Sequence, residues 1–96
     1  MPKKSKNVPK DYLQHKKRTS LAIGARIKLR RRQLIFSQEE LRRRLQLEGV
    51  YISRSQFSRL ESGTNLPSAV EIIALASALQ TSFAWLLVGG KETTVQ

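Results

Sequence analysis

The sequence predicts an all-α fold, a compact bundle of five helices. Apolar residues recur at helical spacing from residue 19 onward, and the alternation typical of strands is absent. Serine caps precede several of these segments and glycines follow them. The 96 residues suffice for one domain, and without cysteine the sequence offers neither disulfides nor thiolate metal sites.

The first predicted helix begins at a cap formed by Ser20. Ile23, Ile27 and Leu34 then recur at intervals of four and seven residues, which places them on one side of a helix. Residues 1–18 contain two prolines, little apolar content and no periodicity, so we expect a flexible basic arm there. The other side of the helix is basic and carries Arg26, Lys28, Arg30 and Arg32.

Two further helices follow, each opened by a capping box. Ser37 and Glu40 form the first box, and the second runs from Ser53 to Gln56. Gly49 ends the earlier helix and Gly63 ends the later one. The expected buried residues are Leu41, Leu45, Phe57 and Leu60, and Arg42, Arg43 and Arg44 are expected to face outward.

The fourth predicted helix follows Pro67 and Ser68, and the fifth begins near Ser82 and ends at Gly89. The domain therefore spans residues 19–90, and residues 91–96 are expected to form a disordered tail. The expected core residues of the fourth helix are Ile72, Leu75, Ala76 and Leu79, and the fifth helix carries the apolar residues Phe83, Leu86 and Leu87.

The charge is concentrated in the N-terminal part of the chain. Of the net charge of +11, residues 1–20 hold seven bases minus one acid (+6), and residues 21–36 hold five bases and no acid (+5). Residues 37–61 add five bases minus four acids (+1), and residues 62–96 hold one base minus two acids (−1). A one-sided basic distribution is typical of proteins that bind polyanions.

Other classes of protein fit the sequence poorly. The chain shows no signal peptide and no apolar segment long enough to span a membrane, so we expect a cytoplasmic protein without a membrane partner. His15 is the only histidine, and no catalytic set is recognisable. We therefore expect neither an enzyme nor a metal or other cofactor.

The stretch from Ser37 to Gly63 resembles the helix-turn-helix of the Cro/cI-type (XRE) family of DNA-binding regulators. The resemblance covers roughly residues 20–90 and all five predicted helices. It implies a lambda-repressor-like domain that binds double-stranded DNA. The matching segments are Ile23-Gly24-Ala25-Arg26-Ile27, Ser37-Gln38-Glu39-Glu40-Leu41, residues 52–63, Pro67-Ser68 and Ala84-Trp85-Leu86-Leu87.

The resemblance makes the third helix the recognition helix, which lies in the major groove. Arginine can donate two hydrogen bonds to guanine, and serine can bond to several base edges. Arg54 and Arg59 lie about 140° apart around a helix of 3.6 residues per turn, so one of them can contact phosphate while the other reads a base. The candidate base-contacting residues are Ser53, Arg54, Ser55, Ser58 and Arg59.

Other residues are expected to contact the DNA backbone or to hold the helices together. The resemblance implies a phosphate contact for Gln38 and backbone contacts for Thr64 and Asn65. It also implies an ion pair between Arg31 and Glu61 that joins the first helix to the third; alternatively, Arg31 simply adds to the basic face. The other candidate backbone contacts are Arg26, Arg42, Lys3, Lys4 and Lys6.

The chain departs from the family pattern between the second and third helices. The interval from Ser37 to Ser53 is five residues longer than in the short form of the motif. We expect the second helix to gain about a turn and either Val50 or Ile52 to return to the core. Tyr51 either contacts the DNA backbone or covers the core edge.

Three functions remain open at this point. The first is a repressor that binds a pseudo-palindromic operator as a homodimer, with Phe83, Trp85 and Leu86 as candidate dimer contacts; Trp85 alternatively packs in the core. The second is an antitoxin that binds a toxin or another protein partner. The third is a protein–protein adaptor that binds polyanions without sequence preference.

Overall fold

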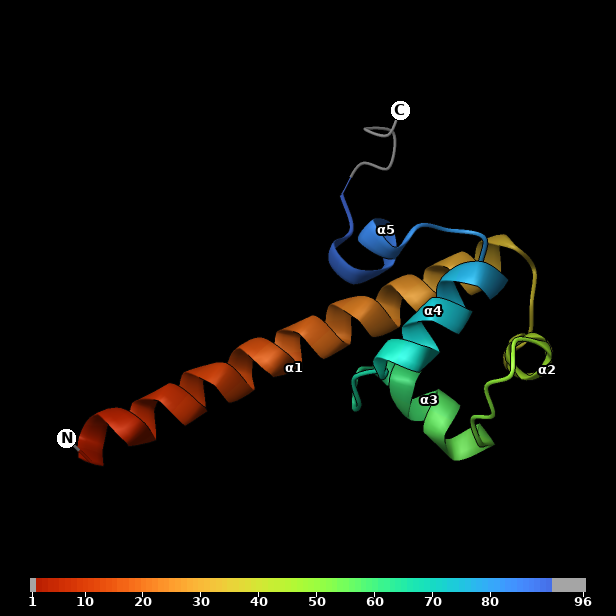
Figure 1. Cartoon of the computed structure of the whole chain (residues 1–96). Helices are drawn as coiled ribbons and strands as arrows, with labels where there is room; N and C mark the ends of the chain where they lie inside the picture. The colour runs from red at the N-terminus through yellow and green to blue at the C-terminus, as the bar shows by residue number, and fades with distance from the viewer. Residues whose placement is uncertain (1, 91–96) are drawn as a thin grey trace.

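The structure is a computed structural model that describes the backbone of residues 2–90 and the side chains of residues 9–90. This part of the chain is all-helical, as predicted, and consists of five helices joined by short turns (Figure 1). None of these helices is both long and apolar enough to cross a membrane. The helices are α1 (Pro2–Gln33), α2 (Gln38–Leu47), α3 (Arg54–Ser62), α4 (Ala69–Ala78) and α5 (Phe83–Val88).

The first helix is longer than predicted. It begins at Pro2 and continues without a break through Ser20, which is buried inside the helix. The predicted cap at Ser20 is therefore wrong, and the segment expected to be an irregular arm has a helical backbone. Residues 10–20 are mostly good helix formers and include neither glycine nor proline, so the helix can extend without buried contacts. The flexibility of this segment stays a prediction.

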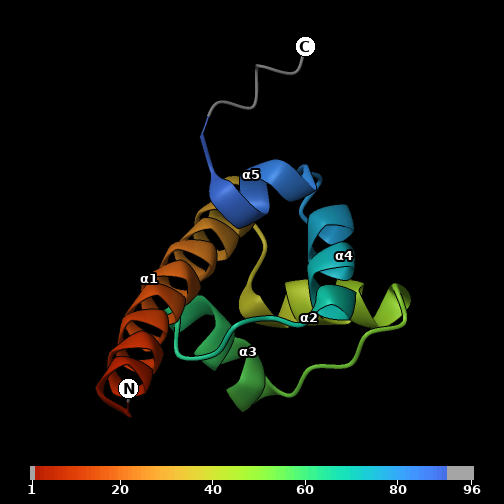
Figure 2. The ribbon, with the colours of Figure 1, turned by 60° about the vertical axis from the view of Figure 1, so that its left-hand side comes forward.

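The N-terminal half of α1 projects beyond the other helices, whereas its C-terminal half packs against α3 and α5 (Figures 1 and 2). The side chains from Pro9 to Arg18 are all exposed. We call residues 2–18 the α1 extension. The predicted tail, residues 91–96, and the side chains of Lys3, Lys4 and Lys6 lie outside what the structure describes.

One core receives apolar residues from every helix. Phe57 is completely buried at its centre, and Ile52, which precedes α3, returns to the core as expected. Leu86 is also completely buried, so its predicted place on a dimer surface is wrong. The core residues are Ile23, Ile27, Leu41, Leu45, Ile52, Phe57, Leu60, Ile72, Ala74, Leu75, Ala76, Ala78, Leu79 and Leu86.

A glycine allows α1 and α3 to cross closely. A Cβ atom added at Gly24 would collide with the carbonyl oxygen of Leu60 and lie 2.8 Å from that of Glu61. Gly63 ends α3 with φ +83°, a left-handed conformation that suits glycine, and it packs against Leu21 of α1. The missing side chains therefore bring the end of α3 directly onto the first helix.

Serines cap the four shorter helices, as the sequence predicts. Ser37, Ser53, Ser68 and Ser82 each accept a hydrogen bond from the backbone N–H three residues later. The predicted box at Ser37 is incomplete, because the carboxylate of Glu40 pairs with two arginines of its own helix instead of the Ser37 N–H. The cap at the start of α3 is a complete box, which fixes where that helix begins.

Candidate nucleic-acid interface

One side of α3 faces solvent and presents basic and polar groups. Phe57, Leu60 and Glu61 point into the protein, whereas the side chains predicted to read bases lie on the exposed side. This exposed side carries no acidic residue. A helix with this distribution can offer hydrogen-bond donors to a groove without burying a carboxylate against phosphates. The exposed candidates are Arg54, Ser55, Ser58 and Arg59.

The fifth candidate, Ser53, already has a structural role. Its hydroxyl accepts a hydrogen bond from the N–H of Gln56 at 3.2 Å, and the Gln56 side chain accepts one from the Ser53 N–H at 3.1 Å. Ser53 is half-buried. Its hydroxyl also lies 3.5 Å from that of Ser55, so the residue primarily fixes the first turn of α3, and its base contact stays a prediction.

The longer connection between α2 and α3 is ordered by backbone bonds and one arginine. Helix α2 ends at Leu47, and the residues after it form the connection. The expected gain of a turn in α2 stays a prediction. Gly49 adopts a φ of +88°, and the Val50 N–H donates to the Leu45 carbonyl at 2.9 Å. The Nε of Arg42 donates to the carbonyl of Ile52 at 3.0 Å, next to the cap of α3.

This contact changes the expected role of Arg42. The prediction that it faces outward is wrong, because its side chain lies over the turn and is half-buried. Tyr51 in the same turn is mostly exposed, and Val50 packs against the core edge. The Nε bond leaves the two Nη groups of Arg42 for another partner, so its phosphate contact stays a prediction.

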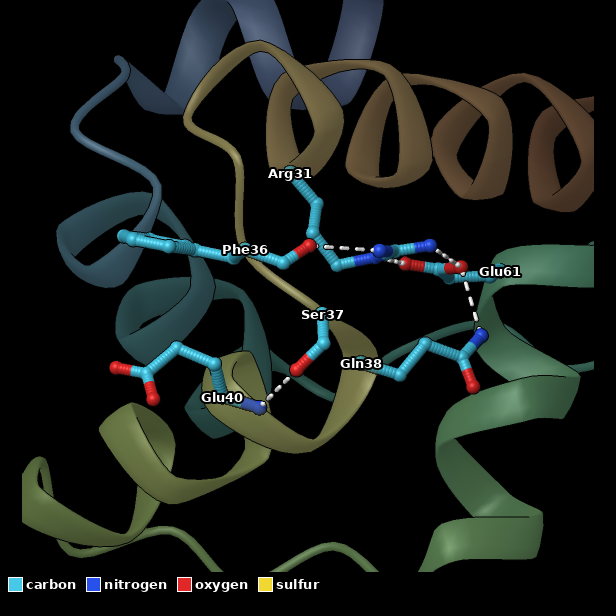
Figure 3. A network of polar contacts seen from close by, with 6 residues as sticks. All are labelled: Arg31, Phe36, Ser37, Gln38, Glu40 and Glu61. Carbon is cyan, nitrogen blue, oxygen red and sulfur yellow. Dashed lines mark hydrogen bonds and ion pairs between the residues drawn. The ribbon is translucent and has the colours of Figure 1, made fainter.

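The structure brings Arg31 and Glu61 together, as the resemblance implied (Figure 3). The Arg31 Nε donates to Glu61 Oε2 at 2.6 Å and its Nη2 donates to Oε1 at 3.0 Å, a two-point contact. The third nitrogen, Nη1, donates to the Phe36 carbonyl at 2.8 Å. The side chains of the pair are only 10% and 4% exposed. Arg31 thus joins α1, the α1–α2 turn and α3.

The hydrogen bonds to Glu61 raise the pKa of Arg31 above its ordinary value and outweigh the opposing effect of burial. Its guanidinium therefore stays charged around neutral pH, as arginine does in proteins generally. A buried pair of opposite charges resists separation, because either partner alone would be left uncompensated. The pair holds α3 at a fixed angle to α1.

Gln38, predicted to contact phosphate, belongs to the same network. Its side-chain Nε2 donates to Glu61 Oε1 at 2.9 Å, which ties the first turn of α2 to α3 (Figure 3). The side chain is half-buried, and this hydrogen bond already gives its amide nitrogen a partner. A phosphate at this point could still accept hydrogen bonds from the backbone N–H groups at the start of α2 that have no partner within the helix.

Thr64 and Asn65 lie exposed in the turn after α3, where a DNA backbone could reach them. The N–H of Thr64 donates to the Arg59 carbonyl at 2.9 Å, and the Thr64 hydroxyl lies 2.9 Å from that of Ser62. These bonds hold the turn in one conformation. Their DNA contacts stay predictions.

Arg26 lies apart from these residues. Its Nη1 donates to the Leu86 carbonyl at 3.1 Å, near the end of α5, and its guanidinium packs over Gly89. This placement favours a structural role over the predicted phosphate contact. Arg30 is used in a similar way, with Nε donating to the Leu79 carbonyl at 2.9 Å at the end of α4.

The remaining dimer candidates differ in exposure. Phe83 is 55% exposed, whereas Trp85 is half-buried and packs against the core. Leu87 and Val88 of the same short helix are also exposed. An apolar surface thus exists on α5, but it consists of Phe83, Leu87 and Val88 in place of the predicted Leu86.

Lys16 and Lys17 are absent from the site residues predicted individually from the sequence. Both lie on the α1 extension and line a groove whose other side is the turn after α3. Sequence alone offered a signal, because Lys17, Ser20 and Gly24 recur at helical spacing along the side of α1 that meets α3. The prediction of an irregular arm over residues 1–18 hides this signal, because a helical spacing has meaning only within a helix.

Comparisons with known proteins agree with this arrangement. A family model described as a helix-turn-helix domain matches residues 22–84. The HTH-type transcriptional regulator DicA of Escherichia coli (strain K12) is 34% identical over 73 residues, which cover 76% of this chain and 50% of that protein. The chain thus spans about half the length of this relative. No solved structure matches significantly.

Proposed function

The chain belongs to the XRE-type helix-turn-helix regulators, and on this premise we propose that it binds a pseudo-palindromic operator in double-stranded DNA and represses transcription. In this proposal α3 enters the major groove, and a bound dimer excludes RNA polymerase from the promoter. The observation that carries the proposal is the outward side of α3, where two arginines and two serines are exposed without an acidic neighbour.

The roles of these side chains follow from their positions. Arg54 and Ser55 occupy the first turn of α3, and in helix-turn-helix proteins the N-terminal residues of the recognition helix contact base edges. Arg59 lies in the last turn. We assign Arg54 and Ser55 to base recognition, and Ser58 and Arg59 to the flanking bases or phosphates. Gln38, Arg42, Thr64 and Asn65 would contact the backbone on either side.

We further propose that two copies bind the operator together. The exposed side chains of Phe83, Leu87 and Val88 on α5 give each copy an apolar surface. A symmetric contact between two such surfaces would set the distance between the recognition helices, and this distance must match one or more helical turns of DNA. The expected operator is therefore a pair of inverted half-sites about 10 base pairs, or a multiple of about 10 base pairs, apart, centre to centre.

The experiment that tests this function is selection of duplexes from a random pool by the purified protein. The recovered duplex is then titrated against mixed-sequence competitor at raised salt. A regulator of this kind should prefer the recovered duplex by about a thousandfold or more. An adaptor that binds polyanions would show no sequence preference. An antitoxin would bind its DNA but also copurify with a second small protein.

A further inference from the structure

A groove runs between the α1 extension and the segment that follows α3. In Figures 1 and 2 this part of α1 passes beside the turn that joins α3 to α4. One side of the groove includes Leu13, Lys16, Lys17 and Leu21 of α1, and the other includes Thr64 and Asn65. Two segments far apart in the sequence thus form a single surface feature.

The chemistry of this groove matches a sugar–phosphate strand. Two ammonium groups, a hydroxyl and a side-chain amide can all donate to phosphate oxygens, and these groups are common in backbone contacts to DNA. The lining also includes one acid, Glu71, whose Oε1 accepts a hydrogen bond from the Ser68 N–H at 2.9 Å, so two lysines against one glutamate leave the groove positive. The leucines, both about half exposed, offer apolar surface to deoxyribose. A flat apolar partner would leave both lysines without compensation, so this lining favours a polyanion.

The lysines are available for such a partner. Among the described residues every ion pair is made by Arg31, Arg43 or Arg44, so neither lysine is paired with an acid. Both side chains are exposed. Lys16 also lies over the ring of Tyr12 at 6.0 Å, a contact that leaves its ammonium group open to solvent on other sides. Two ammonium groups on adjacent residues, neither paired with an acid, make a local positive potential.

The groove is continuous with the recognition surface. Its lining includes Gln56 and Ser62 of α3, both of which are exposed. The close crossing of α1 and α3 at Gly24 lies about two helical turns from Lys17, so the groove begins next to a fixed contact between the two helices. With α3 in the major groove of DNA, the sugar–phosphate backbone that borders this major groove would meet the protein groove next.

We propose that the groove binds the DNA backbone beside the base pairs that α3 contacts, with Lys16 and Lys17 each contacting a phosphate. This inference rests on the proposed function and extends it. The protein would then hold more DNA than the recognition helix alone spans, and the added contacts would be independent of base sequence.

The test compares two double variants of the full chain with the same charge. Lys16→Gln/Lys17→Gln changes the groove, whereas Lys10→Gln/Arg18→Gln changes two other exposed bases of the extension. Each lowers the net charge from +11 to 11 − 2 = +9. The probes are a mixed-sequence 30-base-pair duplex and the duplex recovered by selection, each titrated between about 50 and 200 mM salt, where counterion release dominates affinity.

The slope of log affinity against log salt is negative. In Lys16→Gln/Lys17→Gln it should become less steep by about 1.8, which is about 0.9 for each lost phosphate contact. In the control variant, Lys10→Gln/Arg18→Gln, the slope should change by much less. Equal effects of the two pairs on both duplexes would overturn the proposal, because net charge alone would then explain them. So would a groove variant that binds DNA normally but changes self-association or binding of a protein partner.

A second measurement locates the contact. Neutral methylphosphonates are placed one at a time along the recovered duplex. At phosphates that flank the half-site they should weaken binding by the wild-type protein. They should cause no further loss at those phosphates in Lys16→Gln/Lys17→Gln. If selection recovers no preferred sequence, the proposed function fails, yet the salt slopes on mixed-sequence DNA still decide whether the groove binds phosphate.

Discussion

Arg31 is the residue on which the relative positions of the helices depend most directly. It donates to Glu61 and to the Phe36 carbonyl, and Glu61 in turn accepts from Gln38. Every buried polar side-chain atom of the described residues has a partner. The network therefore fixes α1, α2 and α3 relative to one another at the point where the recognition helix must be held.

Removal of Arg31 should destabilise the fold strongly. Arg31→Ala leaves the Glu61 carboxylate buried without its cation, which we expect to lower the free energy of unfolding by about 3–5 kcal/mol. Arg32→Ala, at an exposed neighbouring position, is the matched control and should change it by less than about 0.5 kcal/mol. Urea unfolding measures both. Similar losses in the two variants would mean that the pair does not stabilise the fold.

A second residue-scale prediction concerns acid. Hydrogen bonding to Arg43, assisted by Arg44, holds the pKa of Glu40 below its ordinary value of 4.5. The unfolded chain therefore binds a proton here at a higher pH than the folded protein does. This contribution to stability is complete above about pH 4.5 and is lost as the pH falls through the lowered pKa.

Glu40→Gln should accordingly make stability less dependent on pH on the acid side. The measurement is the free energy of unfolding between pH 3 and pH 6. Glu39→Gln serves as the control, because the neighbouring carboxylate makes no ion pair among the described residues. A steeper dependence in Glu40→Gln than in the wild type would contradict the assignment.

Sequence reasoning succeeded best for residues whose role depends on near neighbours. A serine cap bonds to an N–H three residues away, so Ser37, Ser53 and Ser68 could be identified from spacing alone. The long side chains of Arg26 and Arg42 could not be placed in this way. Each ends on a carbonyl of another segment, and only the tertiary arrangement brings that carbonyl within reach.

At the scale of helices, the crossing of α1 and α3 depends on Gly24. Gly24→Ala forces a methyl group into the backbone oxygens at the end of α3, and we expect a loss of about 1–3 kcal/mol in the free energy of unfolding. Ala25→Ser, on the exposed side of the same turn, should cost less than about 0.7 kcal/mol. Thermal or urea unfolding distinguishes them. A fully stable Gly24→Ala protein would show that the helices can separate freely.

The start of α1 is a helix that the spacing of apolar residues does not reveal. Apolar spacing reports burial, and the α1 extension forms a helix whose described side chains are all exposed. The α1 extension therefore shows no apolar repeat, and its sequence predicts an irregular arm. The other four helices begin within one residue of their predicted starts, because each has both a cap and a buried side. Local propensity over residues 10–20 was the remaining clue.

For the molecule as a whole, stability and charge reside in different parts. The core lies in residues 23–86, whereas deletion of residues 2–17 removes six bases and one acid, which lowers the net charge from +11 to 11 − 5 = +6. This deletion should change the free energy of unfolding by less than about 0.5 kcal/mol, because the described side chains it removes are exposed.

The same deletion should weaken binding to every duplex and reduce the salt dependence, while the preferred sequence stays unchanged. Denaturation and gel-shift titrations on the deleted and full chains provide the comparison. A changed base preference would place part of the sequence recognition in the extension. A large loss of stability would show that the extension makes stabilising contacts with the rest of the chain.

If α3 reads DNA sequence, the loss of Arg54 should affect different duplexes unequally, and Arg54→Ala is the variant to measure. The variant and the wild type are titrated with the recovered duplex and with mixed-sequence DNA at the same salt. We expect Arg54→Ala to lose about 1–3 kcal/mol of binding free energy on the recovered duplex and less on mixed-sequence DNA, with a relaxed preference at one base pair. An equal loss on both duplexes would contradict base recognition by Arg54.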